Sequence, residues 1–298
     1  MRRGAGFAQF CCGENVSMRL YRSVLYIPGS KPRALDKARS LPVDAIIFDL
    51  EDAVAPNEKQ AARETLRTEL ASGGYGHRVR LVRINGLATP WGEDDARAVA
   101  DMGCDGVLIP KAESRGQIEA LSSLTPGLPV WCMMETPRGA LNALEIADTP
   151  GVAGFVLGTN DLAKDIGCET GGDRAALMTA IQMCLLAARA AGLVCVDGVF
   201  NGFRDEAGFE AEAIQGRALG MDGKSLIHPS QVEAANRVFA PSPDQIDLAE
   251  RQIAAHDAAL AEGQAVAVVD GRIVENLHVE TAKAVLARAD AIRERSEP

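Results

Sequence analysis

The chain has 298 residues, of which 47% are hydrophobic, and this is enough for one large core. Its 31 Lys and Arg against 41 Asp and Glu give a net charge of −10, which disfavours nucleic acid and anionic membrane surfaces as partners. No apolar stretch approaches the roughly 18 residues that span a bilayer, so we expect no membrane insertion.

Eight short apolar runs of the strand type recur along the chain, separated by segments with helical spacing. The strand-type runs are 23–26, 45–50, 81–84, 106–109, 129–134, 153–157, 194–196 and 223–227. The helical segments between and after them include 58–70, 94–102, 117–121, 141–147, 174–191, 206–219 and 230–239. Strands that are apolar on both faces and alternate with helices imply parallel pairing, and eight such units close into a TIM (β/α)8 barrel. The alternative is an open doubly wound sheet, but its GxGxxG phosphate fingerprint is absent after the first run.

The ends of the chain stand apart from this repeat. We expect residues 1–20 to be a disordered N-terminal extension, the alternative being a true start at Met18, residues 21–240 to be the barrel, and residues 241–298 to carry a helix, a hairpin and a lid helix. Ser242 is a plausible helix cap, and Asp270-Gly271 is typical of a tight hairpin turn. His256 is expected at the surface of the first of these helices. This tail is too small to fold alone, so it must pack on its own barrel or on a neighbouring one.

Seven cysteines are scattered without a CxxC pair, and several lie in apolar runs. This pattern favours buried thiols over disulfides or zinc ligands, and so indicates a reducing, cytoplasmic location.

Polar side chains directly follow six consecutive predicted strands. In a β/α barrel these positions face the active site, although any single one of them could equally be a solvated loop residue. The residues are Asp49, Glu51 and Asp52; Arg83 and Asn85; Lys111; Glu135; Asn160 and Asp161; and Asp197. Six in succession favour a functional site.

Glu135 and Asp161 lie one βα unit apart and would stand side by side at the rim. Two carboxylates with no His or Cys nearby suit Mg²⁺ or Mn²⁺, with other positions left for water and substrate. The alternative is an acid/base pair without metal. Arg83 offers a planar fork for a carboxylate or a developing oxyanion, or a salt bridge to Glu51 or Asp52, and both roles can hold at once.

A basic cluster follows the first predicted strand. Lys31, Arg33 and Lys37 surround a Gly turn in an otherwise acidic protein, which indicates a phosphate or pyrophosphate site. The alternative is that they are solvated surface residues.

Seven short motifs contain or adjoin these residues, at 25–30, 48–54, 82–86, 109–111, 134–136, 158–162 and 223–229. Taken together, they resemble the motifs of the HpcH/HpaI aldolase superfamily and, within it, the citrate lyase β-subunit-like branch. The resemblance implies a homotrimeric or homohexameric TIM barrel with Mg²⁺ on Glu135 and Asp161. It also implies that Arg83 contacts substrate, that Tyr26, Lys31 and Lys37 hold the CoA part of an acyl-CoA, and that Asn160, Ile227 and His228 make further substrate contacts.

The resemblance further implies that the hairpin and last helix form a lid over a neighbouring subunit's site. Lyases of this branch carry an Asp in the hairpin, whereas here Gly-Arg-Ile-Val is followed by Glu275. A carboxylate displaced by about 1 Å can change a rate by orders of magnitude. The run 269–278 looks like that of the malyl-CoA thioesterase sub-branch, which hydrolyses the thioester.

The expected activity is therefore Mg²⁺-dependent hydrolysis of (3S)-malyl-CoA, with Arg83, Glu275 and Asp49 as the catalytic residues. Glu275 is the candidate base, although it could instead form a lid-anchoring salt bridge. Two alternatives stay open: a malyl-CoA or citramalyl-CoA lyase that cleaves a carbon–carbon bond, and a citrate lyase β-type subunit that works within a complex.

Overall fold

The computed structural model describes residues 18–169 and 172–296. Of the expected extension at residues 1–20, residues 1–17 lie outside the described residues, and Leu20 is buried. Within the described chain there are two compact units, one of residues 21–239 and one that contains residues 240–296.

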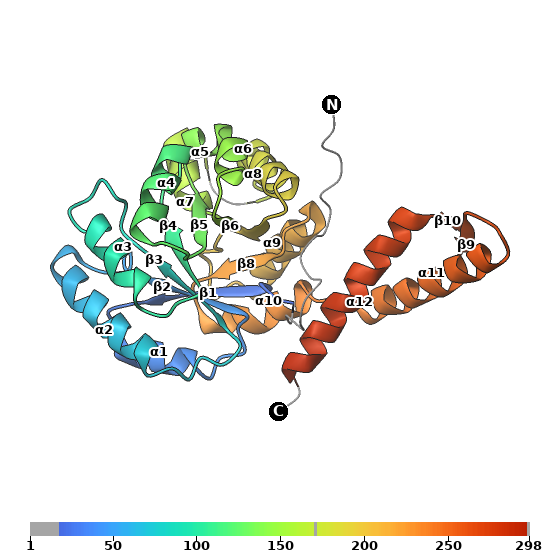
Figure 1. The fold of residues 1–298 in the computed structure, drawn as a ribbon, viewed down its shortest axis with the longest axis horizontal. Helices are drawn as coiled ribbons and strands as arrows, with labels where there is room; N and C mark the ends of the chain where they lie inside the picture. Colours follow the sequence, from blue (N-terminus) through green and yellow to red (C-terminus); the bar gives the residue numbers. More distant parts are fainter. Residues whose placement is uncertain (1–17, 170–171, 297–298) are drawn as a thin grey trace. The chain divides into compact units, whose positions relative to one another are not determined.

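The first unit is a closed barrel of eight parallel strands, in which each strand pairs with the next in sequence and β1 pairs with β8 (Figure 1). The strands are β1 (Ser23–Pro28), β2 (Ala45–Asp49), β3 (Val79–Arg83), β4 (Gly106–Ile109), β5 (Val130–Met134), β6 (Val152–Leu157), β7 (Val194–Asp197) and β8 (Gly223–Leu226). The predicted TIM barrel is confirmed, and an open doubly wound sheet is excluded.

Helices surround the barrel and join successive strands (Figure 1). They are α1 (Pro32–Ala38), α2 (Lys59–Ala71), α3 (Gly92–Ala100), α4 (Arg115–Leu124), α5 (Pro137–Leu141), α6 (Ala143–Ala147), α7 (Thr159–Ile166), α8 (Met178–Ala190), α9 (Glu206–Leu219) and α10 (Val232–Val238). Short 3₁₀ turns precede three of them: η1 (Pro56–Glu58), η2 (Ala175–Leu177) and η3 (Pro229–Gln231).

Side-chain caps begin several helices just after a strand. The Thr136 hydroxyl accepts the Gly139 backbone N–H at 3.0 Å at the start of α5, and Asp205 accepts from Gly208 at 2.9 Å at the start of α9. Such caps satisfy N–H groups that the first helical turn leaves unpaired. They therefore set where the chain turns from strand to helix, at the end of the barrel that carries the site.

The barrel interior is filled by side chains, and one close approach requires a glycine. A Cβ at Gly154 on β6 would lie 2.5 Å from the indole ring of Trp131 on β5. The bare backbone at Gly154 thus makes room for the largest side chain inside the barrel, and the pairing of β5 with β6 shifts register beside Val130 and Trp131.

The second unit is built from α11 (Pro243–Ala261), the hairpin strands β9 (Ala267–Val269) and β10 (Arg272–Val274), and α12 (Asn276–Ser296). Asp270 and Gly271 have φ of 51° and 74°, as the predicted tight turn requires. Ser242 caps α11 through a capping box. The prediction for His256 is wrong, because this α11 side chain is buried.

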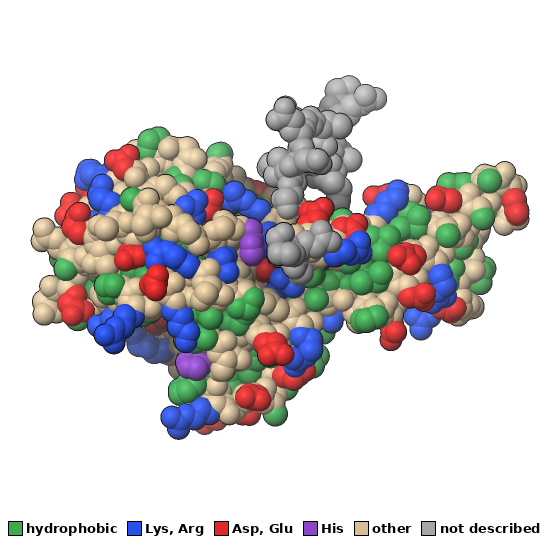
Figure 2. Space-filling model, turned by 90° about the horizontal axis from the view of Figure 1, so that it is seen from below, with side chains coloured by type: hydrophobic (Ala, Val, Ile, Leu, Met, Phe, Trp, Pro, Cys, Tyr) green, Lys and Arg blue, Asp and Glu red, His purple; other side chains and the backbone are tan. Residues whose placement is uncertain are grey.

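The charged side chains on the surface are mixed, and the described cysteines are free. Acidic and basic side chains lie interspersed over the face of the barrel drawn in Figure 2, so the net charge forms no single-sign field there. None of the described helices is long and apolar enough to cross a membrane. The five cysteines among the described residues are free thiols, three of them buried.

Candidate metal and substrate site

A cavity of about 320 Å³ opens at the carboxyl ends of the barrel strands. Seven of the eleven predicted site residues line it: Tyr26, Asp49, Arg83, Glu135, Asn160, Asp161 and Ile227. Their strands are spread around the whole barrel, so only its closure brings them together.

Glu135 follows β5, and Asp161 stands in the first turn of α7 directly after β6. Burial raises the pKa of Glu135 above its ordinary value, and the neighbouring carboxylate of Asp161 adds to this effect. Two carboxylates that line one cavity are suited to share a divalent cation. Among the described residues, no group of three or more His, Cys, Asp or Glu could hold a metal ion. A site with two carboxylates would leave the ion's other ligand positions to water and substrate.

The Glu135 side chain lies between the backbone of Lys111 and that of Gly158. The Lys111 backbone N–H donates to Oε1 of Glu135 at 2.7 Å. On the other side, a Cβ at Gly158 would lie 2.6 Å from Oε2. A glycine at position 158 therefore leaves the space that the Glu135 side chain occupies.

Arg83 is fixed by the acidic loop after β2. Its Nε and Nη2 donate to the two oxygens of Asp49 at 2.8 and 2.7 Å. The remaining Nη1 lies 3.0 Å from Oε2 of Glu51 and 3.3 Å from Oδ2 of Asp52. The predicted salt bridges are present, and Nη1 is the part of the guanidinium that the fork to Asp49 leaves for a ligand.

Asp49 accepts two further hydrogen bonds, from the backbone N–H groups of Glu51 at 2.9 Å and Ala53 at 3.0 Å. Four donors thus meet the two oxygens of this buried carboxylate. Its contacts fix the orientation of Arg83, and its catalytic role stays a prediction.

Tyr26 lies beneath Arg83, whose guanidinium carbon is 5.1 Å from the centre of the ring. The Tyr26 hydroxyl donates to the Met133 sulfur at 3.2 Å. Tyr26 therefore forms part of the cavity floor rather than part of an exposed basic cluster.

Four predicted site residues lie outside this cavity. Lys31 and Lys37 are exposed at the start and the end of α1. The His228 ring packs on Phe203 with centroids 4.9 Å apart, and its Nδ1 accepts from the backbone N–H of Ser230 at 3.2 Å. Glu275 belongs to the C-terminal unit, where its backbone N–H donates to His278 Nδ1 at 3.0 Å.

Some of the lining was not predicted from the sequence. Met133, Leu157 and Val199 are apolar residues in or directly after strands, a position they share with ordinary core residues. Asp52 could have been selected from the sequence, because it belongs to the acidic run after β2. Thr159 belongs to the motif 158–162, but helix α7, which it begins, was not expected.

The chain resembles proteins of known function over most of its length. Residues 22–229 match the family model HpcH/HpaI aldolase/citrate lyase. A (3S)-malyl-CoA thioesterase of Cereibacter sphaeroides is 58% identical over 91% of this chain and 95% of its own. The citrate lyase subunit beta of Leuconostoc mesenteroides is 36% identical over 92% of this chain and 94% of its own.

Among solved structures, the Mycobacterium tuberculosis protein CitE in complex with magnesium, acetoacetate and coenzyme A has a TM-score of 0.77 and 30% identity, covering 90% of this chain and 97% of that one. With a barrel of the same kind and a family match that spans its site, this chain belongs to the HpcH/HpaI aldolase/citrate lyase family.

Proposed function

We propose that this protein hydrolyses (3S)-malyl-CoA to malate and CoA in the cytoplasm, with Mg²⁺ as the natural ion and Mn²⁺ as a possible substitute. The observation that carries the proposal is the convergence of Glu135, Asp161 and Arg83 on one cavity. Relatives with 58% identity that bear the name (3S)-malyl-CoA thioesterase support the choice of substrate.

Glu135 and Asp161 would hold the ion, which would supply a Lewis acid that orients the malyl group and polarises it. Arg83 would bind substrate oxygen through Nη1, while Asp49 keeps the guanidinium plane fixed. Asn160 and Ile227 would contact the acyl group at the opposite wall of the cavity. Each of these groups is positioned before substrate arrives, which lowers the cost of reaching the transition state.

The CoA moiety would extend towards α1, where Lys31 and Lys37 supply exposed cations for its phosphates. Tyr26, at the end of the neighbouring β1, would contact the thioester end of the ligand. His228 would act at the edge of the site, after β8.

Glu275 would be the base that activates water, delivered by the hairpin and α12 of a neighbouring subunit in a homotrimer or homohexamer. Val268, Ile273 and Leu277 are exposed on this unit, and Figure 2 shows hydrophobic side chains on its surface. An apolar surface of this kind is typical of a segment that packs on another molecule.

A lyase is the second candidate, favoured by the family itself and by the metal–arginine pair, which would serve carbon–carbon cleavage equally well. Purified protein given malyl-CoA and Mg²⁺ distinguishes the two. Hydrolysis releases free thiol without glyoxylate, whereas the lyase forms glyoxylate and acetyl-CoA in equal amounts. A β-type subunit of a complex would do neither on free malyl-CoA. Full activity after removal of divalent ions by a chelator would contradict the proposal.

A further inference from the structure

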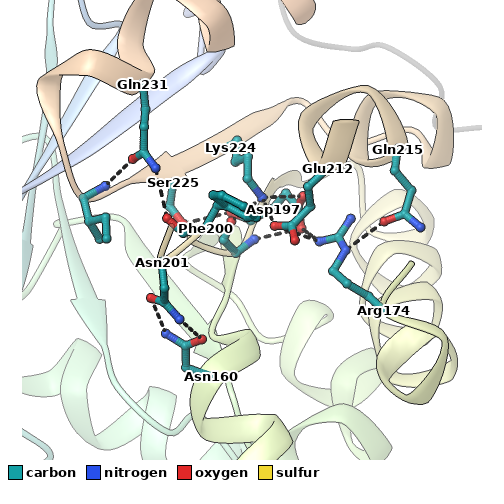
Figure 3. Close-up of polar contacts among 12 residues, drawn as sticks. Asn160, Arg174, Asp197, Phe200, Asn201, Glu212, Gln215, Lys224, Ser225 and Gln231 are labelled. Atoms are coloured by element: carbon teal, nitrogen blue, oxygen red, sulfur yellow. Dashed lines mark hydrogen bonds and ion pairs between the residues drawn. The ribbon is translucent and has the colours of Figure 1, made fainter. Parts of the chain in front are cut away.

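The last residue of β7, Asp197, follows the predicted pattern of strand-end charges but does not line the cavity. It belongs to a buried group that we call the ion cluster: Asp197, Arg174, Lys224 and Glu212 (Figure 3). Arg174 Nη1 donates to Oδ1 of Asp197 at 2.7 Å, and Lys224 Nζ donates to Oδ2 at 3.0 Å. Lys224 also donates to Oε1 of Glu212 at 2.7 Å.

The ion cluster contains two cations and two anions, so its charges cancel. Burial by itself raises the pKa of Asp197, but Lys224 and Arg174 outweigh it and the pKa lies below its ordinary value. The four members come from β7, β8, α9 and the residue before η2. Buried charge of this kind adds little net stability, because desolvation offsets most of the attraction, so stability alone does not account for the cluster.

The contacts of the ion cluster continue into the backbone after β7. Lys224 Nζ donates to the Gly198 carbonyl at 2.7 Å, and Asp197 Oδ1 accepts the Gly198 N–H at 2.8 Å. A Cβ on Gly198 would lie 2.5 Å from Oγ1 of Thr159, the first residue of α7. The cluster therefore fixes a backbone segment that packs directly on the helix carrying Asp161.

Of the next three residues, one lines the cavity and the other two make polar contacts near it. Val199 lines it, and the Phe200 carbonyl accepts from Gln231 Nε2 at 2.9 Å. The side-chain amides of Asn201 and Asn160 pair reciprocally at 3.1 and 2.9 Å (Figure 3). Asn160 lines the cavity and directly precedes the proposed metal ligand Asp161.

We propose that the ion cluster is a positioning device for the substrate site: it holds residues 198–201 so that Val199 forms the cavity wall and Asn201 fixes Asn160 beside Asp161. None of its four members lines the cavity; they act through residues 198–201. The inference rests on the proposed function only where it concerns the metal.

Two variants test it at the two ends of this chain of contacts. Glu212→Gln removes one charge but keeps an oxygen that can accept from Lys224. Asn201→Ala removes the exposed amide pair without opening the core. Matched controls lie at the amino-terminal end of the barrel: Asp44→Asn, which neutralises a buried carboxylate paired with Arg22, and Asn236→Ala, which removes an amide that contacts Ser23 and the Pro42 carbonyl.

Two readouts are needed. The first is hydrogen exchange by mass spectrometry over residues 198–205 and over α7, without ligand. The second is the Kd for Mn²⁺, followed by electron paramagnetic resonance. We expect Glu212→Gln to accelerate exchange in both segments, and both variants to raise the Kd by about tenfold, the range seen when support of a metal ligand is lost. The controls should leave the Kd and both segments unchanged.

Exchange in 198–205 that stays at the wild-type rate in Glu212→Gln would overturn the inference, as would a Kd that shifts no more than in the controls. If the wild-type protein binds no Mn²⁺, the proposed metal site falls. In that case, faster exchange of α7 in Glu212→Gln and Asn201→Ala than in the controls supports the positioning role, and exchange at the control rate overturns it.

Discussion

Lys111 and Glu135 are joined by a hydrogen bond from backbone to side chain, 2.7 Å long, and its donor comes from a residue with a φ of 47°. Left-handed backbone costs a non-glycine residue about 1–2 kcal/mol. The turn after β4 therefore carries strain at the point where it orients a proposed metal ligand, a combination typical of functional sites.

Replacing Lys111 by Gly and by Ala distinguishes the effect of the backbone strain from the effect of losing the lysine side chain. Both variants keep the N–H group, but only Gly removes the steric cost. We expect Lys111→Gly to exceed Lys111→Ala in free energy of unfolding by about 1 kcal/mol, measured by urea denaturation. Equal stabilities would mean that the turn is not strained.

Gly158→Ala should weaken metal binding, because the added Cβ would meet the Glu135 carboxylate at 2.6 Å. We expect the Kd for Mn²⁺ to rise by about tenfold or more. Gly116→Ala in α4 is the matched control, since its Cβ would meet nothing within 4 Å. The prediction fails if the two variants bind Mn²⁺ alike.

Arg83→Lys keeps the charge but loses the planar fork to Asp49. We expect kcat/KM for malyl-CoA to fall by about a hundredfold, as when one oxyanion-stabilising donor is removed. Arg80→Lys provides the comparison on the same strand, where Arg80 pairs with Asp105 outside the cavity. A lysine that works as well as Arg83 would rule out a role for the fork.

Glu51 should make stability depend on pH. Burial raises the pKa of Glu51 from 4.5 to about 7, against the opposing charge of Arg83. A carboxyl whose pKa is raised in the folded state leaves the free energy of unfolding unchanged below its ordinary pKa. It lowers that free energy most once it is ionised. Stability is therefore lost between about pH 4.5 and 7.

The matching measurement compares Glu51→Gln with the wild type in metal-free buffer across this range. The difference in free energy of unfolding should move in favour of the variant by roughly 3 kcal/mol as the pH rises. A difference that is independent of pH would show that Glu51 does not titrate there.

Glu275→Asp shortens the proposed base by one bond. We expect thiol release to fall by about a hundredfold, because a carboxylate 1 Å out of place loses its alignment. Glu280→Asp, at an exposed position in α12, is the control. Retention of the full rate in Glu275→Asp would remove Glu275 from the mechanism.

The strands of the barrel could be predicted from the sequence because most are short apolar runs, although β3 and β8 also carry charged residues. Helix α7 was missed, since Gly158 before it and the polar Asn160 and Asp161 at its start are equally typical of a loop. Residues 141–147 were expected to form one helix, but the chain breaks at Asn142, whose side chain donates to the Glu113 carbonyl at 2.7 Å.

The site was harder to predict than the fold. Residue type and position after a strand were enough to select Glu135, Asp161 and Arg83, because strand ends in a barrel meet at one rim. The same rule selected Asp197, which the structure places in the ion cluster instead. Direction of a side chain at a strand end depends on partners such as Lys224 and Arg174, and these become neighbours only when the barrel closes.

The balanced charge of the ion cluster also limits how this protein can evolve. Loss of any one member leaves a buried ion without its counterpart, at a cost that a marginally stable fold cannot easily absorb. Substitutions among Asp197, Arg174, Lys224 and Glu212 should therefore be accepted in compensating pairs. In lineages that descend from this sequence, the four positions should drift slowly and together, even as the outer faces of the helices diverge.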